Sequence, residues 1–320
     1  MAKKIIESEK DYIESMLELK QQHISSDRTG VGTSKQFNRL FEFNIGDKTK
    51  PLPILIGKHT GLKTALVELV WIMKGRSDLK WLKDNGVHYW DKWVKEDGTF
   101  GPIYGEQMRN FALTGKDQLS DLVDSLQINV NSRRHIISLW DPTTLYKQSL
   151  PACHCFYHMT TEETPEAKIV NLHVTQRSGD SYLGIPYDLL MFMKFMEIVT
   201  FVVNHNLIVS NPDSKLIEVN KLFLTVNDYH LYSNHHKAID KYSNEYAKNS
   251  EIYNPPTGIE FNDYIKSWSN ELIDNGIELD IDMMLDKIVE RNFNIFKYSI
   301  DNYIWTQPTN LLKINASVAV

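Results

Sequence analysis

A thiol, an arginine–serine pair and a carboxylate lie between residues 150 and 188 of this chain. They are Cys153, the pair Arg177 and Ser178, and Asp188 after a glycine–proline turn. A cysteine thiolate is a strong nucleophile, and a guanidinium binds anions such as phosphate. The set therefore predicts an enzyme with a cysteine nucleophile and an anionic substrate. Taken alone, the pattern leaves a second interpretation open, because most unpaired cysteines are small buried core residues.

Other uses of the cysteines are less favoured. Cys153 and Cys155 are the only two cysteines, and residues so close together rarely form an unstrained disulfide, so we expect a reduced, intracellular protein. A dyad of Cys153 with His154 is not expected, since adjacent side chains on a strand point to opposite faces. A zinc site is not expected either, because no second ligand pair follows at the usual spacing. We expect no metal.

Composition narrows the classes of function. The chain has 320 residues, 42% of them hydrophobic, and a formal net charge of −6. This predicts one globular domain over residues 1–320, with a mainly helical insertion at about 240–295. The acidic charge argues against nucleic-acid binding but leaves an anionic small ligand possible. The longest apolar stretch, 189–203, is broken by Lys194 and Glu197 and is shorter than the roughly 20 residues of a membrane span, and the N-terminus lacks a signal-peptide pattern. We expect no membrane partner.

Hydrophobic periodicity and turn residues predict the elements that must position these groups. Helices are predicted at 8–23, 61–74, 117–128, 186–204, 261–274 and 281–291. Strands are predicted at 37–44, 52–56, 136–140, 153–159, 168–175 and 217–226. Residues 26–33 and 101–107 are predicted to be a loop and a turn.

Some residues allow two interpretations. Glu68 lies in an apolar helix, where it is either a surface residue or a buried carboxylate that needs partners. The aromatic run at 88–93 is either core or the wall of a pocket for a planar ligand. Arg133 and Arg134 are either a solvated pair or a phosphate clamp that can serve another subunit. His235 and His236 are expected at the surface.

The order and spacing of short segments over nearly the whole chain resemble the thymidylate synthase family. Each segment alone is a weak signal, but chance agreement of them all is not expected. They are a phosphate loop at 27–33, a buried-glutamate helix at 68–71, a folate-facing segment at 89–91, a Tyr-Gly-x-Gln turn at 104–107, an arginine pair at 132–134, a nucleophile segment at 150–154, segments at 176–180 and 183–186, a sugar-binding segment at 230–235 and an apolar lid at 316–320.

The resemblance implies an α+β fold, in which a twisted mixed β-sheet with packed helices pairs sheet to sheet in a homodimer. It implies a pyrimidine nucleoside monophosphate and 5,10-methylenetetrahydrofolate as substrates, no bound nucleic acid, and a cytoplasmic location, in the host cytoplasm if the source is viral.

The resemblance also implies a role for each site residue. Cys153 attacks C6 of the base, and C5 then takes the one-carbon unit from folate. The catalytic set is Cys153, Glu68, Arg177, Tyr104 and Asp188. The nucleotide is bound by Arg28, Gln176, Ser178, Asp188, His230 and Tyr232, and by Arg133 and Arg134 of the other subunit. Folate is bound by Lys58, Trp90, Asp180, Leu183, Gly184, Tyr187 and Val320.

One residue departs from the family pattern in the base-reading position. The family reads Gly-x-Pro-Phe-Asn, whereas this chain ends the same motif with Tyr187 and Asp188. The amide of asparagine pairs with N3–H and O4 of uracil, but an ionised carboxylate has no donor for O4. It can accept from the N4 amino group of cytosine, with a proton shared between Asp188 and N3. We therefore expect dCMP as substrate, and the dCMP hydroxymethylase branch is the most similar.

The product is less constrained. After one-carbon transfer, hydride from the folate gives a methyl group, whereas water gives a hydroxymethyl group. Trp90 and the apolar tail favour a dry site, but Met108, Thr175, Val226 and Asn227 replace family residues and could admit water. We expect hydroxymethylation, because Asp at this position accompanies it in known relatives. The alternatives are a dCMP methyltransferase, a thymidylate synthase acting on dUMP and a non-enzymatic binding protein.

Overall fold

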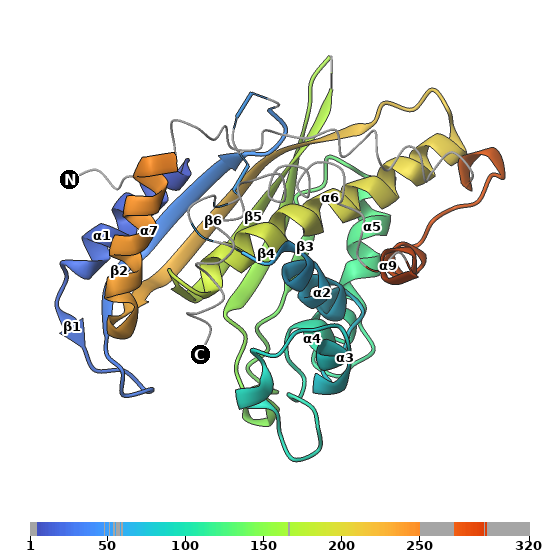
Figure 1. Cartoon of the computed structure of the whole chain (residues 1–320). Helices are drawn as coiled ribbons and strands as arrows, with labels where there is room; N and C mark the ends of the chain where they lie inside the picture. The colour runs from blue at the N-terminus through green and yellow to red at the C-terminus, as the bar shows by residue number, and fades with distance from the viewer. Residues whose placement is uncertain are drawn as a thin grey trace.

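The computed structural model describes residues 5–249 and 272–292, apart from positions 48, 51, 54, 56, 57, 59, 166 and 291. Its centre is a six-stranded sheet in the order β1-β2-β6-β5-β4-β3. β5 and β6 are parallel and the other neighbours are antiparallel, so the sheet is mixed. The strands are β1 (Ile24–Ser25), β2 (Thr33–Asn44), β3 (Ile136–Ser138), β4 (His154–Glu163), β5 (Lys168–Asp180) and β6 (Ile217–Tyr232). The predicted α+β class is confirmed (Figure 1).

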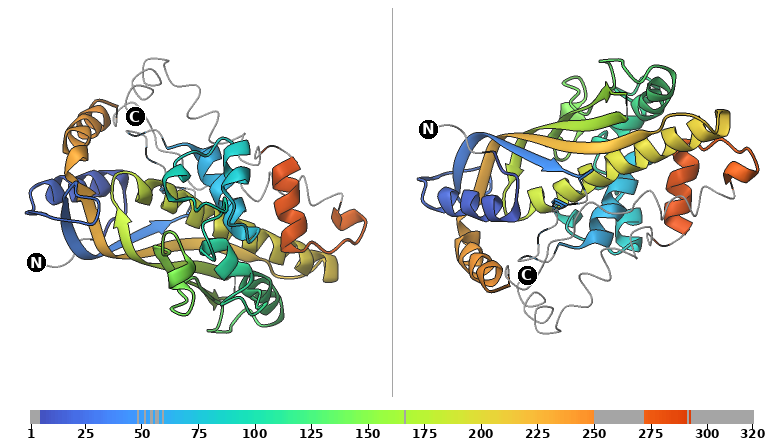
Figure 2. Two further views of the ribbon diagram at one scale, coloured as in Figure 1. Left: turned by 90° about the horizontal axis from the view of Figure 1, so that it is seen from below. Right: turned by 90° about the horizontal axis from the view of Figure 1, so that it is seen from above.

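The longest helix, α6 (Gly184–Ser210), connects the two parallel strands. Parallel neighbours need such a crossover, and α6 runs along one face of the sheet (Figure 2). Lys194 and Glu197, the charges that interrupt its apolar run, are both buried and form an ion pair at 2.6 Å. Burial raises the pKa of Glu197, and the charge of Lys194 opposes this shift. The pair explains how a helix buried along most of its length tolerates two charged residues.

The remaining helices complete the layers around α6 and the ends of the sheet. They are α1 (Glu9–Lys20), α2 (Leu62–Met73), α3 (Leu79–Asp84), α4 (Tyr104–Arg109), α5 (Gln118–Ile128), α7 (His236–Asn249) and α9 (Ile281–Glu290), with short 3-10 turns at Asp91–Trp93, Leu145–Lys147 and Ser233–His235. Nine consecutive residues of α2, from Ala65 to Met73, are buried. Glu68 is among them, so its interpretation as a surface residue is wrong.

The face of the sheet opposite α6 carries side chains that are exposed or half-buried. Phe156 and His158 on β4, His173 on β5 and Phe223 on β6 alternate with buried neighbours on the same strands. The rings of His173 and Phe223 stack at 4.6 Å between centroids. We call the surface formed by these four residues the open sheet face.

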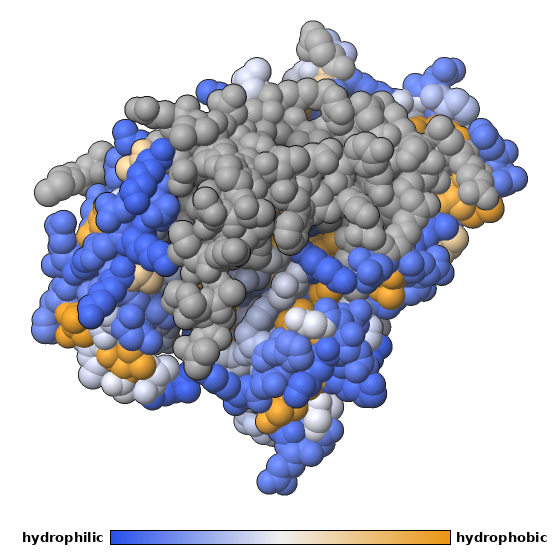
Figure 3. All heavy atoms as spheres, in the orientation of Figure 1, coloured by the Kyte–Doolittle hydropathy of each residue, from blue (hydrophilic) through white to orange (hydrophobic). Residues whose placement is uncertain are grey.

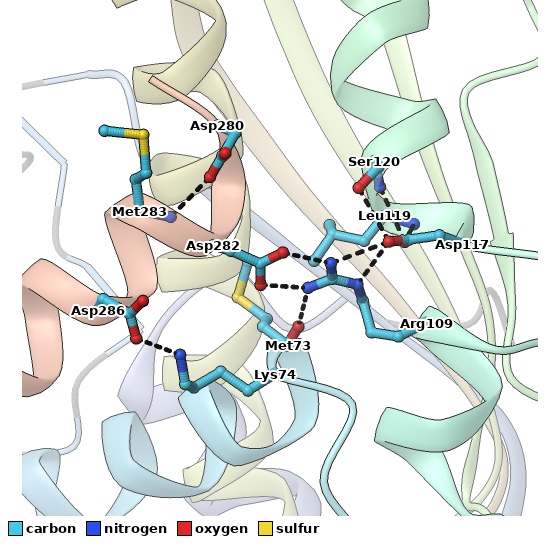
Figure 4. Close-up of polar contacts among 10 residues, drawn as sticks. All are labelled: Met73, Lys74, Arg109, Asp117, Leu119, Ser120, Asp280, Asp282, Met283 and Asp286. Atoms are coloured by element: carbon cyan, nitrogen blue, oxygen red, sulfur yellow. Dashed lines mark hydrogen bonds and ion pairs between the residues drawn. The ribbon is translucent and has the colours of Figure 1, made fainter. Parts of the chain in front are cut away.

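α9 is anchored to the ends of α2, α4 and α5 by charged groups (Figure 4). Arg109 donates to both carboxylate oxygens of Asp282, at 2.9 and 2.8 Å, and to Asp117 at 2.9 Å. Asp117 also caps α5 by accepting from the backbone N–H groups of Leu119 and Ser120. One guanidinium therefore connects the start of α5 with α9, which lies in the insertion predicted at about 240–295.

Several boundaries differ from the sequence-based predictions. The predicted turn at 101–107 is wrong, because α4 begins at Tyr104. Positions 52, 53 and 55 lie in no strand, so the strand predicted at 52–56 is wrong where the structure describes it. β5 continues to Asp180, five residues beyond its predicted end, because it pairs on both sides. The helix predicted at 261–274 falls mainly outside the described residues.

None of the helices in the described ranges is long and apolar enough to cross a membrane. On the face shown in Figure 3, hydrophobic residues lie in small groups among hydrophilic ones.

Candidate active site

Cys153 directly precedes β4 and is held by its backbone. Its N–H donates to the Tyr104 hydroxyl at 3.0 Å, and its sulfur lies 3.7 Å from Ser178 Oγ. Arg177 donates to the carbonyl oxygens of Pro151 and Ala152, at 2.8 and 2.9 Å. The guanidinium thus fixes the loop that presents the thiol. Tyr104, Arg177 and Ser178, all expected from sequence, are brought together at Cys153.

The second cysteine is in a different environment. Cys155 lies within β4, where its sulfur donates to the carbonyl oxygen of Cys153 at 3.6 Å. Burial raises the pKa of the Cys155 thiol and so disfavours its thiolate, with Arg177 opposing the shift. The candidate nucleophile is therefore Cys153.

Glu68 is a buried carboxylate with two donors on the aromatic run. Trp90 Nε1 donates to Oε1 at 2.8 Å, and the Tyr89 hydroxyl donates to Oε2. Burial raises the pKa of Glu68 to about 7; the two hydrogen bonds oppose this shift and the charge of Asp188 adds to it. A carboxyl group poised near neutrality can take up or release a proton during turnover.

Asp188 lies in the first turns of α6 and already accepts two hydrogen bonds. His154 Nε2 is 3.0 Å from Oδ1, and Gln176 Nε2 donates to Oδ2 at 2.7 Å. Since a carboxylate only accepts, the amide nitrogen of Gln176 must face it. The amide oxygen of Gln176 is buried without a partner among the described residues. Gln176 is therefore able to accept one further hydrogen bond, as a substrate-binding residue would.

The loop at 26–32 is shaped by its own side chains. Asp27 accepts the backbone N–H groups of Thr29 and Gly32 at 2.5 and 2.6 Å, and Gly30 and Gly32 have φ angles of +78° and +88°. Hydrogen bonding, first from the Thr29 hydroxyl, lowers the pKa of Asp27. Left-handed backbone of this kind favours glycine. The loop leaves Arg28 exposed to solvent.

The sugar-binding segment lies beside the end of β5 because the parallel register pairs Asp180 with His230. His230 Nδ1 is 3.1 Å from Asp228 Oδ1, and its ring is perpendicular to that of Tyr232 at 5.4 Å. His230 therefore presents a ring oriented by two neighbours.

Tyr232 lies close to groups from three other segments. Burial raises the pKa of its phenol, the charges of Asp180 and Cys153 raise it further, and Arg28 opposes them. Arg28, Asp180 and Cys153 therefore lie within electrostatic range of Tyr232.

Several of the residues expected to contact folate lie at or beside the start of α6. Asp180 Oδ1 accepts the backbone N–H groups of Tyr182 and Leu183, at 2.8 and 3.1 Å. Lys58 donates to the Tyr182 carbonyl at 2.5 Å and lies 5.9 Å from the Tyr187 ring. Burial lowers the pKa of Lys58 to about 8, with Asp180 opposing the shift. Leu183, just before Gly184, is 49% exposed.

Trp90 has a role that the sequence did not predict. It is 5% exposed and packs against Trp71 and Phe100, at 5.9 and 5.1 Å, while its N–H holds Glu68. The interpretation of the aromatic run as core is confirmed for this residue. Tyr89 was missed as a partner of Glu68, although its position next to Trp90 in an aromatic run was the available signal.

Other expected residues are not brought together. Arg133 and Arg134 are exposed on the loop before β3, at the edge of the sheet. Val320 lies outside the described residues. His235 and His236, expected at the surface, are both half-buried, and the His235 ring lies 4.9 Å from that of Tyr182. Within the described ranges, no three His, Cys, Asp or Glu side chains form a group suited to a metal ion.

A family model described as "Thymidylate synthase" matches residues 10–255. The chain belongs to the thymidylate synthase family. Membership of the thymidylate synthase family makes this protein a one-carbon transferase. It supports folate-dependent transfer to C5 of a pyrimidine, with methylenetetrahydrofolate as the family's one-carbon donor. Such a reaction requires a nucleophile and a proton carrier, and the candidates that this site offers are the Cys153 thiol and the Glu68 carboxyl group.

Proposed function

We propose that this protein is a dCMP 5-hydroxymethylase that uses 5,10-methylenetetrahydrofolate. The observation that carries the proposal is the pair of contacts made by Asp188: Oδ1 lies 3.0 Å from His154 Nε2, and Oδ2 accepts from the amide nitrogen of Gln176 at 2.7 Å. Such a carboxylate offers a base only acceptors.

The edge of the base decides the substrate. Cytosine protonated at N3 presents two neighbouring donors, N3–H and the N4 amino group, and so matches a carboxylate. Uracil presents N3–H beside the acceptor O4, which would face a second acceptor. A buried polar group left unpaired costs roughly 1–3 kcal/mol. Asp188 thus favours dCMP over dUMP.

Protonation at N3 also prepares the ring for attack. The Cys153 thiolate adds to C6, the C5=C6 electron pair becomes the C4=C5 bond, and the C4=N3 pair moves onto the protonated nitrogen. Arg177 holds the loop that presents the thiol, and Tyr104 holds its backbone N–H. Arg28, Ser178, Arg133 and Arg134 are the proposed phosphate ligands, and His230 and Tyr232 the proposed sugar ligands.

The folate donates the one-carbon unit that C5 takes up. Residues at and beside the start of α6 suit its chemistry, since Lys58 offers a cation to an acidic tail, Tyr187 a ring face and Asp180 a carboxylate. Leu183, Gly184, Trp90 and Val320 complete the proposed folate site.

Loss of the C5 proton and departure of tetrahydrofolate leave an exocyclic methylene on C5, and in the proposed route water adds to it. The electron pair that this addition returns to the ring then expels the Cys153 thiolate from C6 and restores the C5=C6 bond. Glu68, with its pKa raised to about 7 by burial, can accept a proton from that water at neutral pH. Asp at position 188 also accompanies hydroxymethylation in known relatives, which supports this product over methylation.

The proposed active unit is a homodimer formed through the open sheet face. The exposed and half-buried aromatic and histidine side chains of this face, Phe156, His158, His173 and Phe223, suit a self-complementary contact. In such a dimer Arg133 and Arg134, which are exposed at the sheet edge, would reach the partner's nucleotide.

The direct test incubates the enzyme with methylenetetrahydrofolate and either dCMP or dUMP, followed by mass spectrometry of the nucleotide. We expect dCMP to gain one hydroxymethyl group without the rise in absorbance that dihydrofolate gives. A product carrying a bare methyl group, or turnover of dUMP alone, would contradict the proposal.

A further inference from the structure

Two buried polar side chains, His154 and Tyr157, lie behind Asp188, and the proposed chemistry gives Tyr157 no role. Tyr157 Oη lies 3.0 Å from His154 Nδ1, and His154 Nε2 lies 3.0 Å from Asp188 Oδ1. Tyr157 is 3% exposed and His154 is 4% exposed. The imidazole is held from the sides as well, by the rings of Phe192 at 4.8 Å and Tyr104 at 5.1 Å. The ring therefore keeps one orientation, with one nitrogen toward the phenol and the other toward the carboxylate.

The direction of these hydrogen bonds follows from what each group can donate. As a carboxylate Asp188 only accepts, so Nε2 of His154 must carry the hydrogen. In a neutral imidazole Nδ1 is then an acceptor, and the Tyr157 hydroxyl donates to it. Burial raises the pKa of the Tyr157 phenol well above its ordinary value, so the phenol keeps its proton. Both hydrogen bonds then run in the same direction: Tyr157 donates to His154, and His154 donates to Asp188.

We propose that Tyr157 is a positioning residue that locks His154 in the Nε2–H tautomer and thereby keeps Asp188 an acceptor toward the base. This inference rests on the proposed recognition of cytosine by Asp188. Tyr157 touches no substrate itself, because its hydroxyl lies behind the imidazole on β4.

The alternative tautomer of His154, with hydrogen on Nδ1, shows why Tyr157 must fix the position of this hydrogen. With hydrogen on Nδ1, the lone pair of Nε2 would face Asp188, and the carboxyl group would have to carry a proton to pair with it. Oδ1 would then be a donor directed at His154, and the acceptor strength of the carboxyl group toward N3–H and N4–H of cytosine would fall. A neutral carboxyl group also tolerates O4 of uracil better than a carboxylate does. The tautomer of His154 thus controls the selectivity between the two bases.

The first measurement needs no substrate. In the full-length protein labelled with ¹⁵N-histidine, we expect the His154 nitrogen shifts of a neutral ring with hydrogen on Nε2. In Tyr157→Phe we expect averaged shifts from both tautomers. A wild-type ring with hydrogen on Nδ1, or with both nitrogens protonated, would overturn the inference and leave the base preference to be judged separately.

The second measurement compares kcat/KM for dCMP and dUMP. Tyr157→Phe should lower the dCMP:dUMP ratio by about tenfold, the scale of one buried hydrogen bond. His154→Gln places an amide N–H near the position of Nε2 but has no tautomers, so it should retain much of the wild-type ratio. In His154→Gln, adding Tyr157→Phe should change the ratio little, because the phenol acts only through the imidazole.

If Tyr157→Phe lowers the dCMP:dUMP ratio equally in the wild type and in His154→Gln, Tyr157 has a merely structural role and the inference is overturned. The matched control is Tyr242→Phe, which removes another buried hydroxyl, bonded to Glu9 at 2.6 Å on the contact between α7 and α1. It should leave the ratio unchanged. If the wild type itself prefers dUMP while the tautomer is as expected, the proposed function fails and the tautomer lock stands.

Discussion

The indole N–H of Trp90 donates to Oε1 of Glu68 at 2.8 Å, and thereby holds a buried carboxyl group that has a pKa of about 7. The hydrogen bonds from Trp90 and Tyr89 lower this pKa, whereas burial raises it. The protonation of Glu68 near neutral pH is therefore set mainly by its burial, and the two aromatic donors of a neighbouring segment hold the pKa below the value that burial alone would give.

Removing one of these donors should move the pH dependence of turnover. If the ionised form of Glu68 accepts a proton, kcat/KM falls as pH drops through about 7. In Tyr89→Phe the carboxylate loses a donor, its pKa rises, and this acid limb should shift to higher pH. Profiles measured from pH 5.5 to 9 on both proteins check this, and an unmoved limb would assign the titration to another group.

Glu68 should also make stability depend on pH. Its pKa is raised from 4.5 in the unfolded chain to about 7 in the folded protein. The folded state therefore holds the proton more tightly, and stability present below about pH 4.5 is lost as pH rises through 7. From this one group, the free energy of unfolding should be about 3 kcal/mol lower well above pH 7 than below pH 4.5. Denaturant unfolding at pH 5 and 8 should show a smaller pH effect in Glu68→Gln than in the wild type.

Asp188→Asn should invert the base preference. The amide restores a donor toward O4 of uracil, so kcat/KM for dUMP should rise and that for dCMP should fall. The expected swing in their ratio is at least about tenfold, from one mismatched buried pair. Initial rates with each nucleotide measure it, and an unchanged ratio would show that this residue does not read the base.

Mixed dimers test whether Arg133 and Arg134 serve the partner's site. A Cys153→Ser protomer and a protomer with Arg133→Ala and Arg134→Ala should each be nearly inactive as homodimers. Mixing them after dissociation should restore activity, because one of the two sites then has its thiol and the arginines of the other subunit. No recovery, with mixed dimers shown to form by mass spectrometry, would place the arginines outside the partner's site.

The anchoring of α9 should be worth a modest amount of stability. Asp282 is 55% exposed, so solvent screens its paired contact with Arg109, and Asp282→Ala should cost about 0.5–1 kcal/mol. Glu290→Gln, at the exposed end of the same helix, is the control and should change little. Equal unfolding midpoints for Asp282→Ala and the wild type would show that the ion pair does not anchor the helix.

The sequence could predict residues whose role depends on their chemical type within a motif. Cys153, Arg177 and Asp188 were found in this way, and the structure brings Cys153 and Arg177 together. The sequence could not predict that the indole N–H of Trp90 donates to Glu68, because an aromatic run fits both a core and a pocket wall. It also could not pair His154 with Asp188, since that contact joins β4 to α6 across the crossover. The short helix at Tyr104–Arg109 was missed because Gly101, Pro102 and Gly105 are typical of turns.

The central claim is that Asp188 selects cytosine. A single reaction with equal concentrations of dCMP and dUMP and limiting methylenetetrahydrofolate gives the ratio of the two kcat/KM values from the product masses. The account predicts that hydroxymethyl-dCMP dominates. A mixture dominated by thymidylate would contradict it.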